Sequence, residues 1–245
     1  MIKVLGFCAS PRDGNSKYLL DEAMDAIKSR AAEIDEEVSI KTCTVRGKKL
    51  SGCLMCQGCM KDGICLIKDD FEELQNLWLE ADAVIYSVPV YHMGMPAQMK
   101  AFIDRLGNSM FGRYKARYGE GLNVFPKSLK AIGCISQGIH IFSGQEHTIT
   151  QVINHAILCG CVPVAGDMWE SYIGASGWTY NDERRDALKT QYAQGLEDAR
   201  AAVCATKSVA TKTFDMAVLL KNGGNCCPKI AKDPTYTAFA DRLGQ

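Results

Sequence analysis

Short apolar segments alternate with segments of helical periodicity along most of the chain. Five apolar segments of strand length predict buried strands at residues 2–7, 38–42, 83–87, 128–136 and 161–168. Apolar residues at helical spacing predict helices between and after them, at 15–30, 71–80, 96–106, 145–159 and 184–203. This alternation predicts an α/β fold, in which helices cover both faces of a parallel sheet. A ligand is then expected beyond the carboxyl ends of the strands, in the loops after the first, third and fourth.

The remaining segments divide the chain into one domain and its appendages. We expect the domain to span residues 1–203, with a cysteine-rich loop at 44–66. Residues 107–127, which are aromatic and basic, are expected to be an insertion, and residues 204–245 a C-terminal extension. A length of 245 residues suits this organisation.

Composition excludes several classes of partner. Lys and Arg total 28, as do Asp and Glu, so the formal net charge is zero and nothing attracts nucleic acid or an anionic membrane. No apolar run reaches the length of a membrane span, and the first residues do not resemble a signal peptide. We therefore expect a soluble, cytoplasmic protein that binds neither nucleic acid nor membrane.

The loop after the first strand has the side chains of an anion site. Ser10 and Ser16 offer hydroxyls, Arg12 offers a guanidinium, and Asn15 and Ser16 begin the next helix, where backbone N–H groups are free. The loop lacks both the G-x-G-x-x-G of dinucleotide sites and the G-x-x-x-x-G-K-[ST] of nucleoside triphosphatases. By these residues alone, an ordinary strand-to-helix turn is a competing interpretation.

Two segments resemble one known family over about the first 170 residues. Ser-Pro-Arg-Asp-Gly-Asn-Ser at 10–16 is similar to the phosphate loop of the NADPH-dependent FMN reductase and flavodoxin-like superfamily. The segment 87–105 is similar to that family's S-P-V-Y … G … Q-L-K-x-F-I-D-R, with Val88 inserted. The chain departs from the family at 139–142, where Ile-His-Ile-Phe replaces glycines before Gly-Gln-Glu.

The resemblance implies a flavodoxin-like three-layer α/β/α sandwich with a five-stranded parallel sheet of order 2-1-3-4-5. It implies that the FMN phosphate is held by Ser10, Arg12, Asn15 and Ser16. The loop that would run along the isoalloxazine edge consists of Pro89, Val90, Tyr91, His92, Met93 and Gly94. Further candidate contacts with the flavin are Ser136, Gln137 and Gly138.

Four cysteines form the most unusual pattern in the chain. Cys53-x2-Cys56-x2-Cys59-x5-Cys65 can bring four thiolates to one centre, and four thiolates satisfy either a [4Fe–4S] cluster or tetrahedral zinc. Zinc sites more often have two separated C-x2-C pairs, and thiols without a metal are a further alternative. The pattern resembles the iron–sulfur flavoproteins, a branch of the same superfamily that carries FMN and one [4Fe–4S] cluster per chain.

These features together predict a flavin-dependent oxidoreductase that transfers electrons between FMN and a [4Fe–4S] cluster. No catalytic acid, base or nucleophile is indicated, and none is required for electron transfer. The expected electron donor is ferredoxin or NAD(P)H, and the resemblance implies a homodimer or homotetramer. A cluster-free NAD(P)H-dependent FMN or quinone reductase and a non-enzymatic, flavodoxin-like carrier are the alternatives.

Overall fold

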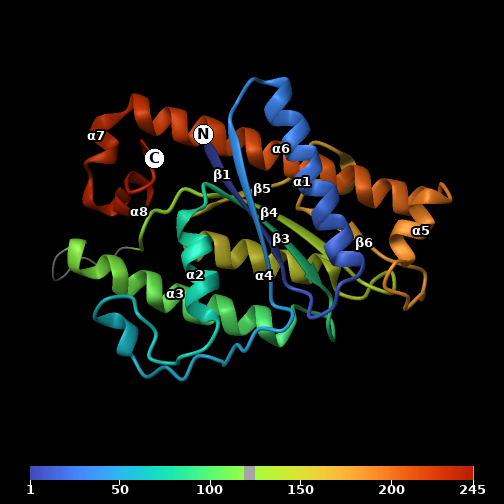
Figure 1. Ribbon diagram of the computed structural model, residues 1–245, viewed down its shortest axis with the longest axis horizontal. Helices are drawn as coiled ribbons and strands as arrows, with labels where there is room; N and C mark the ends of the chain where they lie inside the picture. The colour runs from blue at the N-terminus through green and yellow to red at the C-terminus, as the bar shows by residue number, and fades with distance from the viewer. Residues whose placement is uncertain (119–124, 245) are drawn as a thin grey trace.

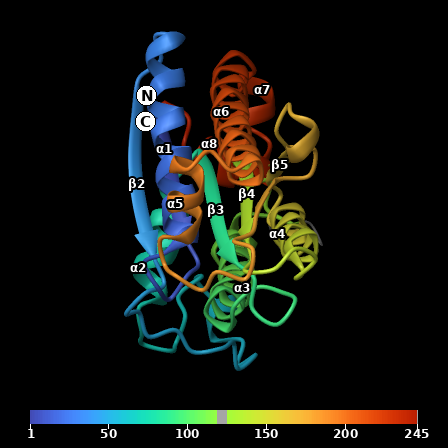
Figure 2. The same ribbon diagram turned by 90° about the vertical axis from the view of Figure 1, so that its right-hand side faces the viewer.

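A parallel sheet forms the centre of the protein, as the computed structural model shows for residues 1–118 and 125–244 (Figure 1). Five strands have the order β2-β1-β3-β4-β5, which confirms the order expected from the sequence. Figure 2 shows β2 and β5 at opposite sides of this sheet. The five strands are β1 (Ile2–Cys8), β2 (Val38–Thr44), β3 (Ala83–Pro89), β4 (Ala131–Gln137) and β5 (Val162–Val164).

Alternate residues of the strands face two separate hydrophobic cores. In β1, Ile2 and Val4 face the core formed with α1 (Asn15–Glu33) and α6 (Glu197–Cys226). The intervening Leu5 and Phe7 face the core formed with α2 (Phe71–Glu80), α3 (Ala97–Tyr118) and α4 (Gln145–Leu158). Helices thus cover both faces, as the alternation of strands and helices predicts.

The last expected strand is shorter than residues 161–168, and a sixth strand was not predicted. β5 pairs with the first half of β4, and β6 (Ala175–Gly177) pairs with its end, from Ile135 to Gln137. Between them lies the short helix η2 (Trp169–Ser171). The sequence gives no signal for β6, because Ala-Ser-Gly lacks the apolar and β-branched residues typical of strands.

The single helix predicted over residues 184–203 is wrong. The chain forms α5 (Ala187–Ala193), turns at Gly195 with a φ of 79°, and then begins α6. Gly195 ends the first helix because glycine adopts positive φ without steric cost.

Two helices run through the boundaries expected for the appendages. α3 continues to Tyr118, so residues 107–118 extend a helix, while 119–124 of the expected insertion lie outside the described residues. α6 crosses residue 203, and its buried side chains continue from Ala199 to Lys221. After it come α7 (Pro228–Ala231), η3 (Pro234–Tyr236) and α8 (Thr237–Ala240).

A buried ion cluster at Asp82 holds the C-terminal segment against the sheet. Asp82 accepts hydrogen bonds from Lys221 Nζ at 2.9 Å, Arg242 Nε at 3.2 Å and the backbone N–H of Lys3 at 3.0 Å. Arg242 also donates to the carbonyl oxygens of Ser128 and Ala238. One carboxylate therefore joins the amino ends of β1 and β3 to both α6 and the last residues of the chain.

No helix in the described ranges is both long enough and apolar enough to cross a membrane.

We predict that Asp82→Asn lowers the free energy of unfolding by about 3–5 kcal/mol, because it leaves two buried cations without their carboxylate. Urea unfolding followed by circular dichroism measures this change. Asp25→Asn, which removes a carboxylate exposed on α1, is the matched control and should cost less than about 0.5 kcal/mol. Equal effects of the two substitutions would contradict the role of the ion cluster.

Candidate functional site

The loop between β1 and α1 is shaped by the hydroxyl group of Ser10. Ser10 Oγ donates to the carbonyl oxygen of Arg12 at 2.8 Å and accepts from its N–H at 3.1 Å. Ser16 is buried at the start of α1, and its carbonyl oxygen accepts a hydrogen bond from Ser87 Oγ at 2.7 Å. The loop is thus fixed both by its own hydroxyl and by the end of β3.

The structure brings the four predicted phosphate-binding residues together at one pocket. Its lining comes from four segments, namely the β1–α1 loop, the ends of β3 and β4, and residues 184–185, as expected for the carboxyl edge of a parallel sheet. The residues are Ser10, Arg12, Gly14, Asn15, Ser16, Pro89, Gln137, Arg184 and Arg185. Arg184 and Arg185 were not predicted here, because the sequence predicted them at the start of a helix over 184–203, whereas α5 begins only at Ala187.

A tight turn at the end of the loop after β3 presents two large side chains to solvent. Tyr91 and Gly94 exchange backbone hydrogen bonds of 2.8 and 3.0 Å. His92 and Met93 between them have φ angles of 48° and 68°, which define a type I′ turn. Left-handed conformations of non-glycine residues cost about 1 kcal/mol or more each and are found most often at functional sites. Tyr91 and Met93 are exposed at this turn.

The loop after β4 packs directly against that turn. Gly144 has a φ of 105°, and a Cβ atom there would collide with the carbonyl oxygen of Met93. Val90 N–H donates to the carbonyl oxygen of Gln137 at 2.8 Å, and Gly138 N–H donates to Gly177 at 2.9 Å. The loops after β3 and β4 therefore form one continuous rim.

The three residues predicted at the end of β4 differ in their access to this rim. Ser136 is fully buried, and its Oγ has no hydrogen-bond partner among the described residues. Gln137 is largely buried but lines the phosphate pocket, and its side chain donates to the carbonyl oxygen of Gly138. Gln137 is thus the member of this group that reaches the pocket.

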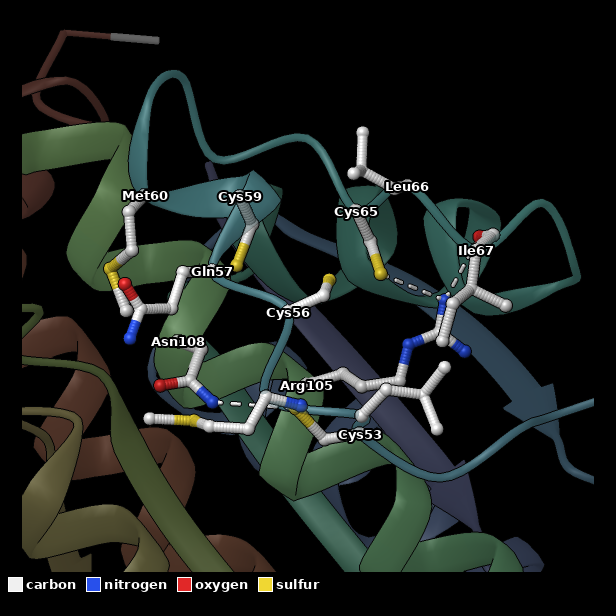
Figure 3. A pocket seen from close by; sticks show the side chains of 12 residues that line it. Cys53, Cys56, Gln57, Cys59, Met60, Cys65, Leu66, Ile67, Arg105 and Asn108 are labelled. Carbon is white, nitrogen blue, oxygen red and sulfur yellow. Dashed lines mark hydrogen bonds between the residues drawn. The ribbon is translucent and has the colours of Figure 1, made fainter.

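The four cysteines of the 44–66 loop line one hollow beside α3 (Figure 3). The sulfur atoms of Cys56, Cys59 and Cys65 point toward the same space in this view. Burial, and then the neighbouring Cys65 thiolate, raise the pKa of the Cys59 thiol. In the ranges that the structure describes, however, no three His, Cys, Asp or Glu side chains converge closely enough to hold a metal ion.

Three N–H donors are directed at two of these sulfur atoms. Arg105 Nη2 lies 3.3 Å from Cys65 Sγ, and Asn108 Nδ2 lies 3.5 Å from Cys53 Sγ. The backbone N–H of Met55 also donates to Cys53 Sγ, at 3.4 Å. Hydrogen bonds of this kind stabilise thiolates and, in cluster proteins, tune the reduction potential.

A buried ion pair anchors both ends of the cysteine loop. Arg105 Nη1 lies 2.7 Å from Asp69 Oδ2, and the two side chains are 1% and 7% exposed. Asp69 accepts the N–H of Ser51 at 2.8 Å, while Arg105 donates to the carbonyl oxygens of Ser51 and Ile67. Burial raises the pKa of Asp69, but the hydrogen bonds from Arg105, Ser51 and Phe71 outweigh it and lower this pKa below its usual value.

Comparison with known proteins identifies the family. Residues 2–166 match the sequence model of the NADPH-dependent FMN reductase family. An iron–sulfur flavoprotein of Archaeoglobus fulgidus is 34% identical over 186 residues, which cover 76% of this chain and 85% of that protein. One from Methanocaldococcus jannaschii is 30% identical over 177 residues, which cover 72% and 82%. The chain therefore belongs to the NADPH-dependent FMN reductase family and is an FMN-dependent oxidoreductase.

Solved structures support the fold. An azoreductase from Bacillus anthracis has a TM-score of 0.59 and 18% identity, over 86% of this chain and 100% of that one. RosB, in complex with 8-demethyl-8-formylriboflavin-5′-phosphate, has a TM-score of 0.62 and 13% identity, over 95% and 87%. At these identities the two structures show a shared flavodoxin-like fold and nothing more.

We predict that the free energy of unfolding falls as the pH decreases from about 5 to about 3, in part because of Asp69. A carboxyl group with a lowered folded-state pKa stabilises the protein above its unfolded pKa of about 3.9. This contribution is lost as the pH falls through the folded-state pKa.

Asp69→Asn tests this contribution by urea unfolding at several pH values. The variant should be about 3–5 kcal/mol less stable at pH 7, because Arg105 remains buried without its carboxylate. Its stability should also change less between pH 5 and pH 3. Asp25→Asn serves again as the exposed control, and an unchanged pH dependence in Asp69→Asn would refute the assignment.

Proposed function

We propose that this protein is an iron–sulfur flavoprotein, which transfers electrons between FMN and a [4Fe–4S] cluster. Cys53, Cys56, Cys59 and Cys65 would be the ligands of the cluster. The observation that carries the proposal is that these four thiols line one hollow, where N–H donors are directed at two of them. The relatives from A. fulgidus and M. jannaschii, both named iron–sulfur flavoproteins, support it.

The donor set of the hollow suits a cluster in its chemistry. All four candidate ligands are cysteines, as in cubane clusters, and three of them have C-x2-C-x2-C spacing. Arg105 would partly compensate the negative charge of the thiolates, because it contacts Cys65 directly. The sulfur atoms would have to draw closer together, which segment 54–57 allows because all four of its residues are exposed to solvent.

The pocket at residues 10–16 suits the phosphate of FMN. Arg12 and the backbone N–H groups at the start of α1 would bind the phosphate oxygens, with Ser10 and Ser16 as further contacts. Asn15 also lines the pocket, but its side chain is hydrogen bonded to Arg184 and Leu188. The turn formed by Pro89, Val90, Tyr91, His92, Met93 and Gly94 would lie along the isoalloxazine ring, with Gln137 and Gly138 beside it.

The flavin, when bound, can accept two electrons and release them singly, whereas a cluster carries one electron at a time. The residues of this chain would position the two groups and exclude side reactions. Cys53 of the cysteine loop and Met95 of the loop after β3 line the same groove between α3 and α4. These two loops therefore open onto one surface. The implied homodimer or homotetramer would cover surfaces of this kind.

Iron and acid-labile sulfide in anaerobically purified protein test the cluster. We expect about four of each per chain, together with FMN. Cys59→Ala should lose most of the iron and keep its FMN, because Cys59 lies apart from the phosphate pocket. Cys204→Ala, a substitution of an exposed thiol on α6, should keep both. Absence of iron after reconstitution, or a Cys59→Ala variant with full iron content, would overturn the proposal.

The electron donor separates the alternative functions. Bleaching of the flavin absorbance by NADPH alone would identify a nicotinamide-linked reductase, and together with absence of iron it would favour the cluster-free reductase. We expect reduced ferredoxin to bleach the flavin faster than NADPH, because ferredoxin donates one electron at a time and a cluster accepts one electron at a time. Stopped-flow spectroscopy with each donor measures the two rates. A flavin that is reduced by ferredoxin but passes no electrons to a small acceptor would indicate a carrier.

A further inference from the structure

Residues 179–188, called here the strap, connect the loop after β4 to the phosphate loop. At one end, the N–H groups of Thr179 and Asn181 donate to the carbonyl oxygen of Ile139, at 3.3 and 3.1 Å. The side chain of Asn181 is also hydrogen bonded to His140. The strap lies beyond residue 166, where the match to the family ends.

Asn15 fastens the other end of the strap to the start of α1. Its Nδ2 donates to the carbonyl oxygen of Arg184 at 3.2 Å, and its Oδ1 accepts the N–H of Leu188 at 3.0 Å. Both polar atoms of this side chain are thus engaged by the strap. The backbone of Arg185 lies against Gly14, since a Cβ on this glycine would be 3.3 Å from the Arg185 carbonyl oxygen.

The two arginines of the strap differ in their charge environment. Arg184 makes a two-pronged ion pair with Asp182, with its Nη2 at 2.7 Å and its Nε at 3.0 Å from Oδ2, so its charge is compensated. Arg185 lines the phosphate pocket and is exposed, and in the part of the chain that the structure describes it takes part in no ion pair. The neighbouring Asp13 carboxylate is already paired with Arg46. Glu183 and Asp186 belong to the strap but do not line the pocket.

We propose that Arg185 is a second guanidinium ligand of the flavin phosphate and that Asn15 is the residue that positions it. The inference rests on the assignment of the phosphate to residues 10–16 in the proposed function. Arg12 and Arg185 both line the pocket, and they would reach the phosphate from two different segments, the β1–α1 loop and the strap. Two guanidiniums suit a phosphate monoester that is close to a dianion, and riboflavin lacks this phosphate.

Flavin binding by the whole 245-residue chain, freed of flavin by dialysis, tests the proposal. Titrations with FMN and with riboflavin, followed by flavin fluorescence, give the two dissociation constants. Arg185→Gln should weaken FMN binding roughly tenfold, the effect expected for one charge-assisted hydrogen-bonded contact, and change riboflavin binding less than about twofold. Arg185→Lys should fall between the wild type and Arg185→Gln, because it keeps the charge but loses the forked geometry.

A matched control and a second variant keep the outcomes distinct. Lys189→Gln removes a positive charge from an exposed position on α5 and should leave both dissociation constants unchanged. Arg12→Gln should weaken FMN binding but not riboflavin binding. If Arg12→Gln has no selective effect, the assignment of the phosphate pocket fails. If it has this effect and Arg185→Gln does not, only the role of the strap is refuted.

A double-mutant cycle tests the positioning role of Asn15. If Asn15 holds Arg185 in place, Arg185→Gln should weaken FMN binding less than threefold in an Asn15→Ala background, against roughly tenfold in the wild type. If Asn15 acted on the phosphate independently of the strap, the fold-changes in the FMN dissociation constant caused by Asn15→Ala and Arg185→Gln would multiply in the double variant. Multiplying effects would therefore overturn the positioning role.

Discussion

The parallel register of β1, β3 and β4 is the constraint on which the candidate flavin site depends. Cys8 pairs with Ser87, and Pro89 with Gln137, so all three strands end at the same edge of the sheet. The loops that follow them form one pocket and one rim, held together by backbone hydrogen bonds between β3 and β4. Both hydrophobic cores fix this register, since a shift by one residue would exchange the side chains of the two faces.

The cysteine loop depends on a different interaction. It follows β2 at the side of the sheet and has little regular structure beyond η1 (Gly58–Met60), so tertiary contacts hold it in place. The buried Asp69–Arg105 pair joins both of its ends to α3, and Arg105 also reaches Cys65. The same helix therefore supplies the anchor of the loop and donors to its sulfur atoms. Around a redox centre bound here, the loop would be rigid where it contacts α3, and its exposed side could adjust its conformation.

Much of the fold could be predicted because its signals are local. Apolar runs and helical spacing identified the five main strands, and the order of the sheet followed from the family resemblance. The secondary-structure predictions were wrong where the local sequence signal is weak or does not show where one helix ends and the next begins. β6 consists of small residues, and α5 and α6 share one helical pattern that only the backbone at Gly195 interrupts. The candidate phosphate-binding residues could likewise be predicted, because the loop at 10–16 is contiguous in sequence.

The sequence alone determined the strand–helix alternation, the motifs that resemble those of flavin-binding proteins and the spacing of the four cysteines. Only the tertiary structure revealed the strap and its Arg185, the contact of Arg105 with Cys65, and the ion cluster at Asp82. The physical reason is that these contacts join residues far apart in the chain. Periodicity and turn chemistry act over a few residues, whereas long-range contacts depend on how the helices pack against the completed sheet.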